Sequence, residues 1–223
     1  MEKKTGKRRI YMTIYICRWR CRPSSIYKII YHRRVNRSRE EEIRLTGIVL
    51  RTDDKGDQMK IAAIDPGTEM SALVIYDCSE NRLLACEAAI RNVELVRTLS
   101  DPGGWDAVVI EMVAGYGMPV GAEVFETCVW IGRFIQASSC PVHRMLRREV
   151  KLSLCGICNA KDANVRQALL DHFGPGRASA VGTRGTPGPL YGVCGDGWSA
   201  LAVAVAWTQR EQEKTARGGP RGL

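Results

Sequence analysis

Residues 60–68 constrain the fold of this chain more than any other stretch. Four apolar residues, 61–64, run directly into Asp65, and Pro66 and Gly67 then end the run. A short apolar run bounded by turn residues is typical of a buried central strand. We therefore expect Asp65 at the end of a central strand, held in a fixed place at the edge of a sheet.

The pattern that follows predicts an α/β fold. Short polar turns between the first three strands favour an antiparallel meander, whereas the strand–helix–strand connection to the fourth favours a parallel pair. The predicted strands cover 60–65, 71–76, 83–90, 107–110 and 141–146. The predicted helices cover 93–99, with Asn92 as N-cap, 122–137, 160–173 and 196–207. Residues 174–195 are rich in Gly and Pro and are predicted to form a mobile loop.

The net charge of +9 belongs entirely to residues 1–58, because residues 59–223 contain equal numbers of basic and acidic residues. Two interpretations stay open for this segment. It is either a basic arm that binds phosphate groups, or an extension that is disordered or not native, with Met59 as the natural start. The predicted organisation is an extension (1–58), one domain (59–207) and a disordered tail (208–223).

Composition excludes some other classes of protein. No apolar run approaches the ~18 residues of a membrane span, so no membrane association is expected. The nine cysteines are scattered, mostly among apolar residues, which fits free thiols in a reducing cytosol. Cys155 and Cys158 form a single CxxC pair, which alone is a weak metal-binding signal, and we interpret both as incidental thiols.

Acidic residues end two of the predicted strands. Asp65 ends the first and Glu111 the fourth, so parallel pairing brings both carboxylates to the same edge of the sheet. Two neighbouring acids repel unless a cation lies between them, and hard oxygen ligands suit Mg²⁺ or Mn²⁺. Asp196, at the start of the last helix, is a third candidate ligand. A turn residue and a helix N-cap are the alternative roles of Asp65 and Asp196.

In chain order, these motifs resemble the RuvC-type Holliday-junction resolvases, and most of all their phage and prophage branch. The resemblance covers 59–207 and rests on Ile64-Asp65-Pro66-Gly67, on Val109-Ile110-Glu111 with the glycine-rich loop and helix after it, on residues 160–169, and on residues 196–204. It implies an RNase H-like fold, which is a five-stranded mixed sheet with its first three strands antiparallel, flanked by helices.

The resemblance also implies roles for individual residues. Asp65, Glu111 and Asp196 match metal ligands, and Lys161 matches a basic residue that approaches the scissile phosphate, although a solvated lysine at a helix start is the alternative. Ser199 stands where the family has a second acid on the last helix. This departure puts the second metal ion in doubt, and Asp162 is the nearest acid in sequence that could complete the site.

The implied activity is hydrolysis of a phosphodiester bond in branched DNA, assisted by two Mg²⁺ or Mn²⁺ ions roughly 4 Å apart. Two symmetric cuts would require a homodimer, with the helix at 122–137 as its interface. A phage or prophage protein of this kind would act in the cytoplasm of a bacterial cell. The predicted DNA contacts are Tyr116, Met118, Arg144, Arg147, Arg148, Lys151, Arg177 and Arg184, each with plain solvation as the alternative.

Three other functions compete with this one. Another RNase H-like nuclease, acting on flaps, R-loops or RNA–DNA hybrids, would use the same acids. A catalytically weakened relative that still binds DNA would explain Ser199. A sugar-kinase or actin-like ATPase shares the Asp-Pro-Gly-Thr motif but needs two such domains, for which the chain is too short.

Overall fold

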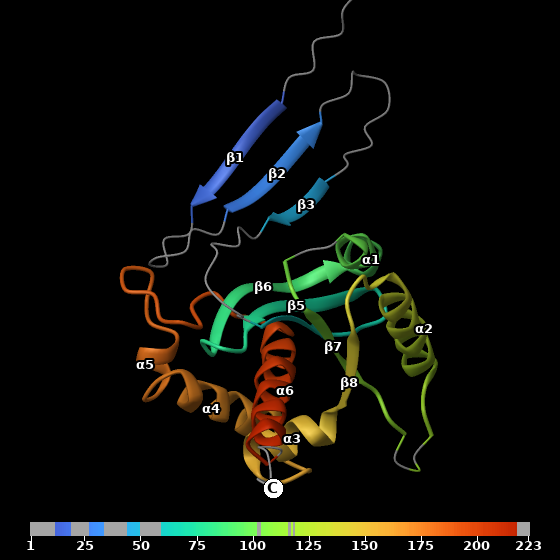
Figure 1. The fold of residues 1–223 in the computed structure, drawn as a ribbon, viewed down its shortest axis with the longest axis vertical. Coiled ribbons are helices and arrows are strands. Elements are labelled where there is room, and N and C mark those ends of the chain that lie inside the picture. The colour runs from blue at the N-terminus through green and yellow to red at the C-terminus, as the bar shows by residue number, and fades with distance from the viewer. Residues whose placement is uncertain are drawn as a thin grey trace, which may run out of the picture. The chain divides into compact units, whose positions relative to one another are not determined.

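The structure is a computed structural model that describes residues 59–101, 104–115, 117 and 119–217, together with the backbone of three strands nearer the N-terminus (Figure 1). The chain divides into two compact units, Met1–Asp53 and Asp54–Leu223. In the first unit, β1 (Met12–Arg18), β2 (Tyr27–Arg33) and β3 (Arg44–Val49) form an antiparallel sheet. The sequence showed no periodic pattern there, and the boundary between residues 58 and 59 stays a prediction.

The second unit contains the predicted five-stranded mixed sheet flanked by helices, so the predicted α/β fold of the RNase H-like type is confirmed. The strands pair in the order β6-β5-β4-β7-β8. The three strands joined by short turns are antiparallel, and β7 and β8, each reached through a helix, are parallel to their neighbours. The strands are β4 (Lys60–Asp65), β5 (Met70–Asp77), β6 (Arg82–Arg91), β7 (Ala107–Met112) and β8 (Val142–Leu146).

Helices cover both faces of this sheet. On one face lies α6, which packs across β4, β5, β6 and β7 and is joined by α3 and α4 (Figure 1). On the other face α1 packs on β5 and β6, and α2 packs on α1. The helices are α1 (Asn92–Ser100), α2 (Ala122–Ala137), α3 (Arg147–Cys155), α4 (Asp162–Phe173), α5 (Arg177–Ala180) and α6 (Gly197–Arg217).

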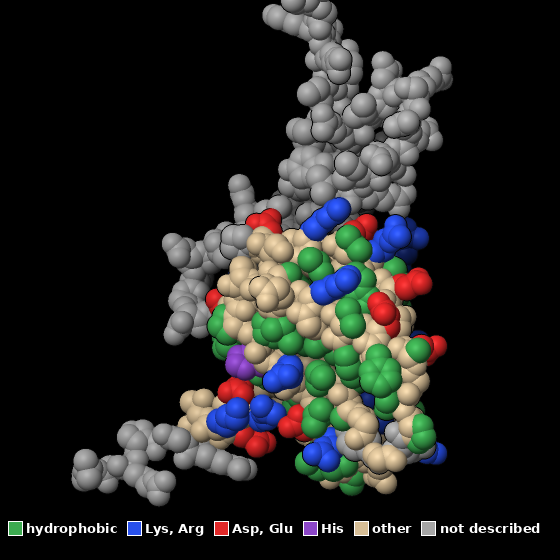
Figure 2. Space-filling model, turned by 90° about the vertical axis from the view of Figure 1, so that its right-hand side faces the viewer, with side chains coloured by type: hydrophobic (Ala, Val, Ile, Leu, Met, Phe, Trp, Pro, Cys, Tyr) green, Lys and Arg blue, Asp and Glu red, His purple; other side chains and the backbone are tan. Residues whose placement is uncertain are grey.

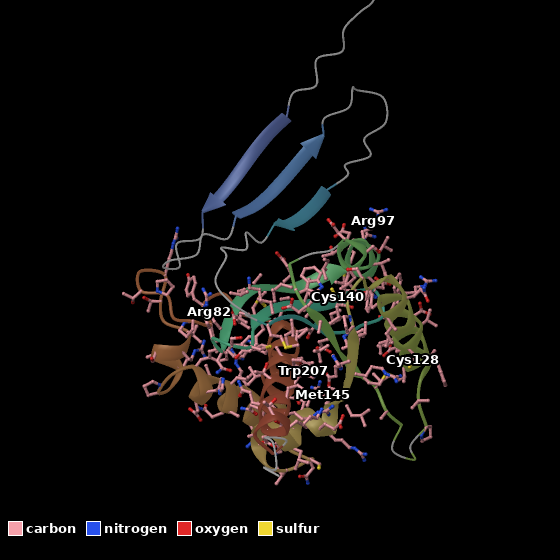
Figure 3. All side chains as sticks on the ribbon, in the orientation of Figure 1. Arg82, Arg97, Cys128, Cys140, Met145 and Trp207 are labelled. Atoms are coloured by element: carbon pink, nitrogen blue, oxygen red, sulfur yellow. The ribbon has the colours of Figure 1, made fainter. Side chains whose placement is uncertain are left out.

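The apolar run of α6 is the centre of the core. All of residues 200–207 are buried, and they pack against alternate residues of the central strands, such as Ile61 and Ala63 of β4 and Val109 of β7. Met145 of β8 and Trp207 of α6 belong to the same core and lie together at the centre of Figure 3. None of the helices in the described part of the chain is long and apolar enough to cross a membrane.

Two predictions about the C-terminal third differ from the structure. The predicted mobile loop 174–195 contains α5 and buries Ala180 and Leu190 completely. Gly188 makes this packing possible, because a Cβ there would lie 2.4 Å from the carbonyl oxygen of Ser179. The predicted disordered tail is helical from Thr208 to Arg217.

Ion pairs stabilise this extension of α6. Lys214 Nζ lies 2.6 Å from Glu211 one turn earlier, and Arg210 lies 3.3 Å from Glu149 of α3. The polar composition that suggested disorder therefore belongs to the last turns of a helix, in which residues 212–216 are all exposed. The short helix α3 was not predicted, because its sequence shows a basic cluster rather than an apolar stripe.

Candidate active site

Asp65 is the last residue of β4 and is partly buried. In a strand, alternate side chains point to the same face, so Asp65 shares the face of Ile61 and Ala63, which pack against the core of α6. The first predicted acid is therefore on the α6 side of the sheet, at the end of its central strand.

A buried polar network holds the turn after Asp65. Ser71 Oγ donates to Asn92 Oδ1 at 2.6 Å, Asn92 Nδ2 donates to the carbonyl oxygen of Gly67 at 2.9 Å, and the Gly67 amide donates to Ser71 Oγ at 3.3 Å. Asn92 was predicted as the N-cap of α1. It is instead the first residue of that helix, and its side chain bonds the turn rather than the helix end.

Gly67 has no space for a side chain. A Cβ atom at this position would lie 2.3 Å from the carbonyl oxygen of Met70. The Asp-Pro-Gly turn thus requires glycine for a close backbone approach. Together with the Ser71–Asn92 network, this approach fixes the backbone that carries Asp65.

Glu111 lies beside Asp65 in the parallel ladder. The pairing of β4 with β7 runs to Ile64 and Ile110, and Asp65 and Glu111 are the next residues of the two strands. Glu111 shares the face of Ala107 and Val109, so both carboxylates point to the α6 side. Only 6% of Glu111 is exposed. An acid is rarely buried to this extent without a partner.

Asp196 directly precedes α6 and is exposed. Its carbonyl oxygen accepts the first bonds of the helix, from the amides of Ser199 and Ala200 at 3.0 and 3.1 Å. Its charge acts on Asp65, as the pKa of that carboxyl reports. The three predicted acids thus come from β4, β7 and the start of α6 and lie within electrostatic range of one another.

Asp65 is a strongly perturbed acid. The pKa of Asp65 is raised from 3.8 to about 7, mainly by burial and next by the charge of Glu111, and Asp196 and a side-chain hydrogen bond with Glu111 contribute in the same direction. The guanidinium of Arg147 acts in the opposite direction. Carboxyl groups whose pKa values are raised by burial and by neighbouring acids are common at functional sites.

Arg147 is bound to Glu111. Its Nη1 lies 3.0 Å from Oε1 and 3.3 Å from Oε2 of Glu111, while its Nη2 lies 3.1 Å from Oδ1 of Asp162. Lys151 Nζ approaches the same Asp162 oxygen at 3.3 Å. Asp162 therefore lies on the opposite side of this guanidinium from Glu111, and its side chain is 71% exposed.

A cavity of about 330 Å³ opens beside this ion-pair cluster. Ser199 of α6 lines it together with Glu111 and Arg147. On another wall, the guanidinium of Arg166 lies 4.5 Å from the ring centroid of Trp198. The residue at the predicted position of a fourth acid is thus in the site, but it contributes a hydroxyl group.

The other predicted site residues are more dispersed. Lys161 is exposed and immediately precedes α4, and its carbonyl oxygen accepts the amides of Asn164 and Val165. Four of the predicted arginines are exposed and lie on different elements: Arg144 on β8, Arg148 on α3, Arg177 at the start of α5 and Arg184 in the loop after α5. Tyr116 and Met118 lie outside the described residues.

Arg147 was predicted as a DNA contact, and its pairing with Glu111 was not predicted. A signal for this pairing exists in the order of the strands. Because β8 is parallel to β7, and Met112 pairs with Leu146, the residue after β8 lies at the same edge as Glu111. The first residue of α3 is therefore able to reach the acids.

The chemistry of the three acids fits a hard divalent cation, since they provide only carboxylate oxygens. Burial, and after it the charges of Glu111 and Asp196, raises the pKa of Asp65, and a cation beside these acids would offset both effects. The arrangement is not a closed cage. Across the described ranges, no group of three acidic, histidine or cysteine side chains is arranged to hold a metal ion. At Glu111 the counter-charge is Arg147.

No family model matches the chain, and no curated protein matches it. Among solved structures, the chain is similar to Thermus thermophilus RuvC at 19% identity and a TM-score of 0.48, covering 70% of this chain and 98% of that one. It is also similar to T. thermophilus RuvC in complex with a Holliday junction substrate, at 19% identity and a TM-score of 0.49, covering 70% of this chain and 97% of that one.

Proposed function

We propose that this chain is a metal-dependent endonuclease of the RuvC type that cuts branched DNA, with the four-way Holliday junction as its substrate. One observation carries the proposal. Asp65 and Glu111 follow the paired residues Ile64 and Ile110 of two parallel strands, on the sheet face against which α6 packs, and Asp196 immediately precedes that helix. A fold that gathers three acids at one strand edge supports chemistry on a phosphate group.

Asp65, Glu111 and Asp196 would hold Mg²⁺ or Mn²⁺. When bound, such ions activate water and stabilise the leaving oxygen of a phosphodiester. The protein holds these acids in fixed positions. Glu111 is buried on a central strand, and the Ser71–Asn92 network keeps Asp65 in place. Of these acids Glu111 lines the cavity, through which a DNA strand would reach it.

Basic side chains near the acids would bind the DNA backbone. Lys161 precedes α4 and Arg148 lies on α3, and both of these helices contribute residues to the cavity. Arg144, Arg177 and Arg184 would extend the contact surface, as would Tyr116 and Met118. Contacts of this kind position the duplex without reading its sequence and make binding dependent on salt.

A homodimer would make the two symmetric cuts that a four-way junction needs. α2 offers a surface for it, because Phe125 is 61% exposed and Val129 is 49% exposed. Figure 2 shows hydrophobic side chains across the face that lies on the right in Figure 1, where α2 is found. The order of the motifs supports the further proposal that the protein is a phage or prophage resolvase that acts in the bacterial cytoplasm.

A second function is favoured by a specific observation. Ser199 replaces a carboxylate and Arg147 binds both oxygens of Glu111, which suits a relative that binds branched DNA but cuts it slowly or not at all. The remaining alternative, an RNase H-like nuclease that acts on flaps, R-loops or RNA–DNA hybrids, would use the same acids.

A panel of labelled substrates tests the proposal. The full chain would be incubated in Mg²⁺ or Mn²⁺ with a four-way junction, a flap, an R-loop, an RNA–DNA hybrid and a linear duplex. Cleavage of the junction at least about tenfold faster than of the other substrates supports junction resolution. Faster cleavage of a flap or hybrid would reassign the substrate, and binding to the junction without cleavage would favour the weakened relative.

A further inference from the structure

We propose that Arg147 is a resident counter-ion of Glu111 that a divalent cation must displace, and that Asp162 holds the displaced guanidinium. The proposal concerns the same site and rests on the metal-dependent activity proposed above. It assigns Arg147 and Asp162 a positioning role that controls how tightly the site binds its metal ion.

The two terminal nitrogens of the Arg147 guanidinium bind different acids. Nη1 binds Glu111, whose side chain is 8% exposed, and Nη2 binds Asp162, whose side chain is 71% exposed. A buried carboxylate needs a counter-charge, whereas an exposed one is well solvated by water. The bond to Glu111 therefore neutralises the site before a metal ion arrives, and the bond to Asp162 keeps Arg147 attached to α4.

A metal ion at Glu111 competes with this pair. Both Glu111 oxygens lie within hydrogen-bonding distance of the same nitrogen, Nη1. A divalent ion on either oxygen would stand a few ångströms from a positive guanidinium, and the repulsion is strong where water is largely excluded. Metal binding and the Glu111–Arg147 contact thus oppose each other.

The Arg147 side chain can move away from Glu111. Its side chain is 45% exposed, so it can turn toward solvent without leaving a cavity in the core. The bond from Nη2 uses one oxygen of Asp162, and a carboxylate can accept a guanidinium at both. Lys151 Nζ lies 3.3 Å from the same Asp162 oxygen, and the Lys151 side chain is 19% exposed. This ion pair stabilises Asp162 in its position.

The test is a titration of the full chain with Mn²⁺, without DNA, at pH 8.5, with the electron paramagnetic resonance signal of free Mn²⁺ as the readout. Arg147→Gln should bind Mn²⁺ about fivefold more tightly than the wild type, because the competing cation is gone. Asp162→Asn should bind about threefold more weakly, because Arg147 then rests on Glu111 alone. Arg147→Met, an uncharged second variant, should behave like Arg147→Gln.

The double variant Arg147→Gln/Asp162→Asn separates the proposed mechanism from simple charge effects. If Asp162 acts through Arg147, its substitution changes nothing once Arg147 is absent, and the double variant binds like Arg147→Gln. If Asp162 attracted the metal ion directly, the loss would persist in the double variant, which would overturn its proposed role.

Arg97→Gln is the matched control, since it removes the same charge from an exposed site on α1, labelled in Figure 3 away from α3. It should leave Mn²⁺ affinity unchanged. Wild-type affinity in both Arg147→Gln and Arg147→Met, with native circular dichroism spectra, would contradict the inference alone. If Asp65→Asn and Glu111→Gln also bound Mn²⁺ as the wild type does, the metal site itself, and with it the proposed function, would be wrong.

Discussion

Arg147 Nη1 lies 3.0 and 3.3 Å from the two carboxylate oxygens of Glu111, and this contact joins the first residue of α3 to the strand beside β8. The acidic edge of the sheet therefore carries its own cation in this structure. This ion pair neutralises the negative charge of the site only in part, because burial, Glu111 and Asp196 still raise the pKa of the neighbouring Asp65 to about 7.

This raised pKa predicts how stability depends on pH. The Asp65 carboxyl titrates near 3.8 in the unfolded chain and near 7 in the folded one, so between these values the folded state binds the extra proton. The free energy of unfolding of the wild type should therefore fall, relative to that of Asp65→Asn, as pH rises from about 4 to about 7. The total loss should be on the order of 4 kcal/mol and constant above about pH 7.

Urea unfolding of both proteins in EDTA, at half-unit steps from pH 4 to pH 8.5, measures this difference. EDTA keeps metal ions from neutralising the acids. Parallel stability curves for the wild type and Asp65→Asn over the whole range would show that Asp65 titrates alike in the folded and unfolded states, contrary to the account.

Gly67→Ala should weaken the turn that holds Asp65. A Cβ would lie 2.3 Å from the Met70 carbonyl oxygen, so the backbone must shift, at a cost of about 2–3 kcal/mol. Chemical denaturation measures the loss. Gly132→Ala is the matched control, because no atom lies within 4 Å of its Cβ and it is inside α2, where alanine should add about 1 kcal/mol of stability. Equal stabilities for the two variants would argue against a tightly packed Asp-Pro-Gly turn.

Ser199→Asp should restore a fourth acid to the site. Ser199 lines the cavity with Glu111 and lies one helical turn after Asp196. An added carboxylate should tighten Mn²⁺ binding by about tenfold, and it should lower the melting temperature in EDTA because a further negative charge then lies unpaired near Asp65. Ser139→Asp, in the exposed loop before β8, adds the same charge away from the acids and should change neither property.

If Ser199→Asp bound Mn²⁺ no more tightly than the wild type, the side chain at this position would not face the metal ligands. Calorimetric titration with Mn²⁺ and thermal unfolding in EDTA together distinguish that result from simple misfolding of the variant.

The acids at the strand ends were predictable because local pattern determines them. The apolar run before Asp65 and the one before Glu111 are long enough to specify buried strands, and the connections specify which pairs are parallel. The alternation of a strand then brings both side chains to the face of α6 without further information.

The contact of Arg147 was not predictable in the same way. It joins residues 36 positions apart and depends on the direction in which α3 leaves β8, which the basic sequence of this nine-residue helix does not specify. Composition was misleading in two other places. Gly and Pro around Leu190 indicated mobility where Gly188 allows close packing, and the polar residues after Trp207 indicated disorder where they form the exposed last turns of α6.

Cleavage of a synthetic four-way junction by the full chain in Mg²⁺ is the decisive measurement for the proposed function. We expect paired cuts with 5′-phosphate and 3′-hydroxyl ends, at a rate that Asp65→Asn lowers by about 100-fold or more because it removes one of the proposed metal ligands. The control Asp101→Asn, at the exposed end of α1, should cut as fast as the wild type. A wild-type protein that binds the junction but leaves it intact in both Mg²⁺ and Mn²⁺ would contradict the proposed function. An Asp65→Asn variant that cuts at the wild-type rate would contradict the proposed role of Asp65.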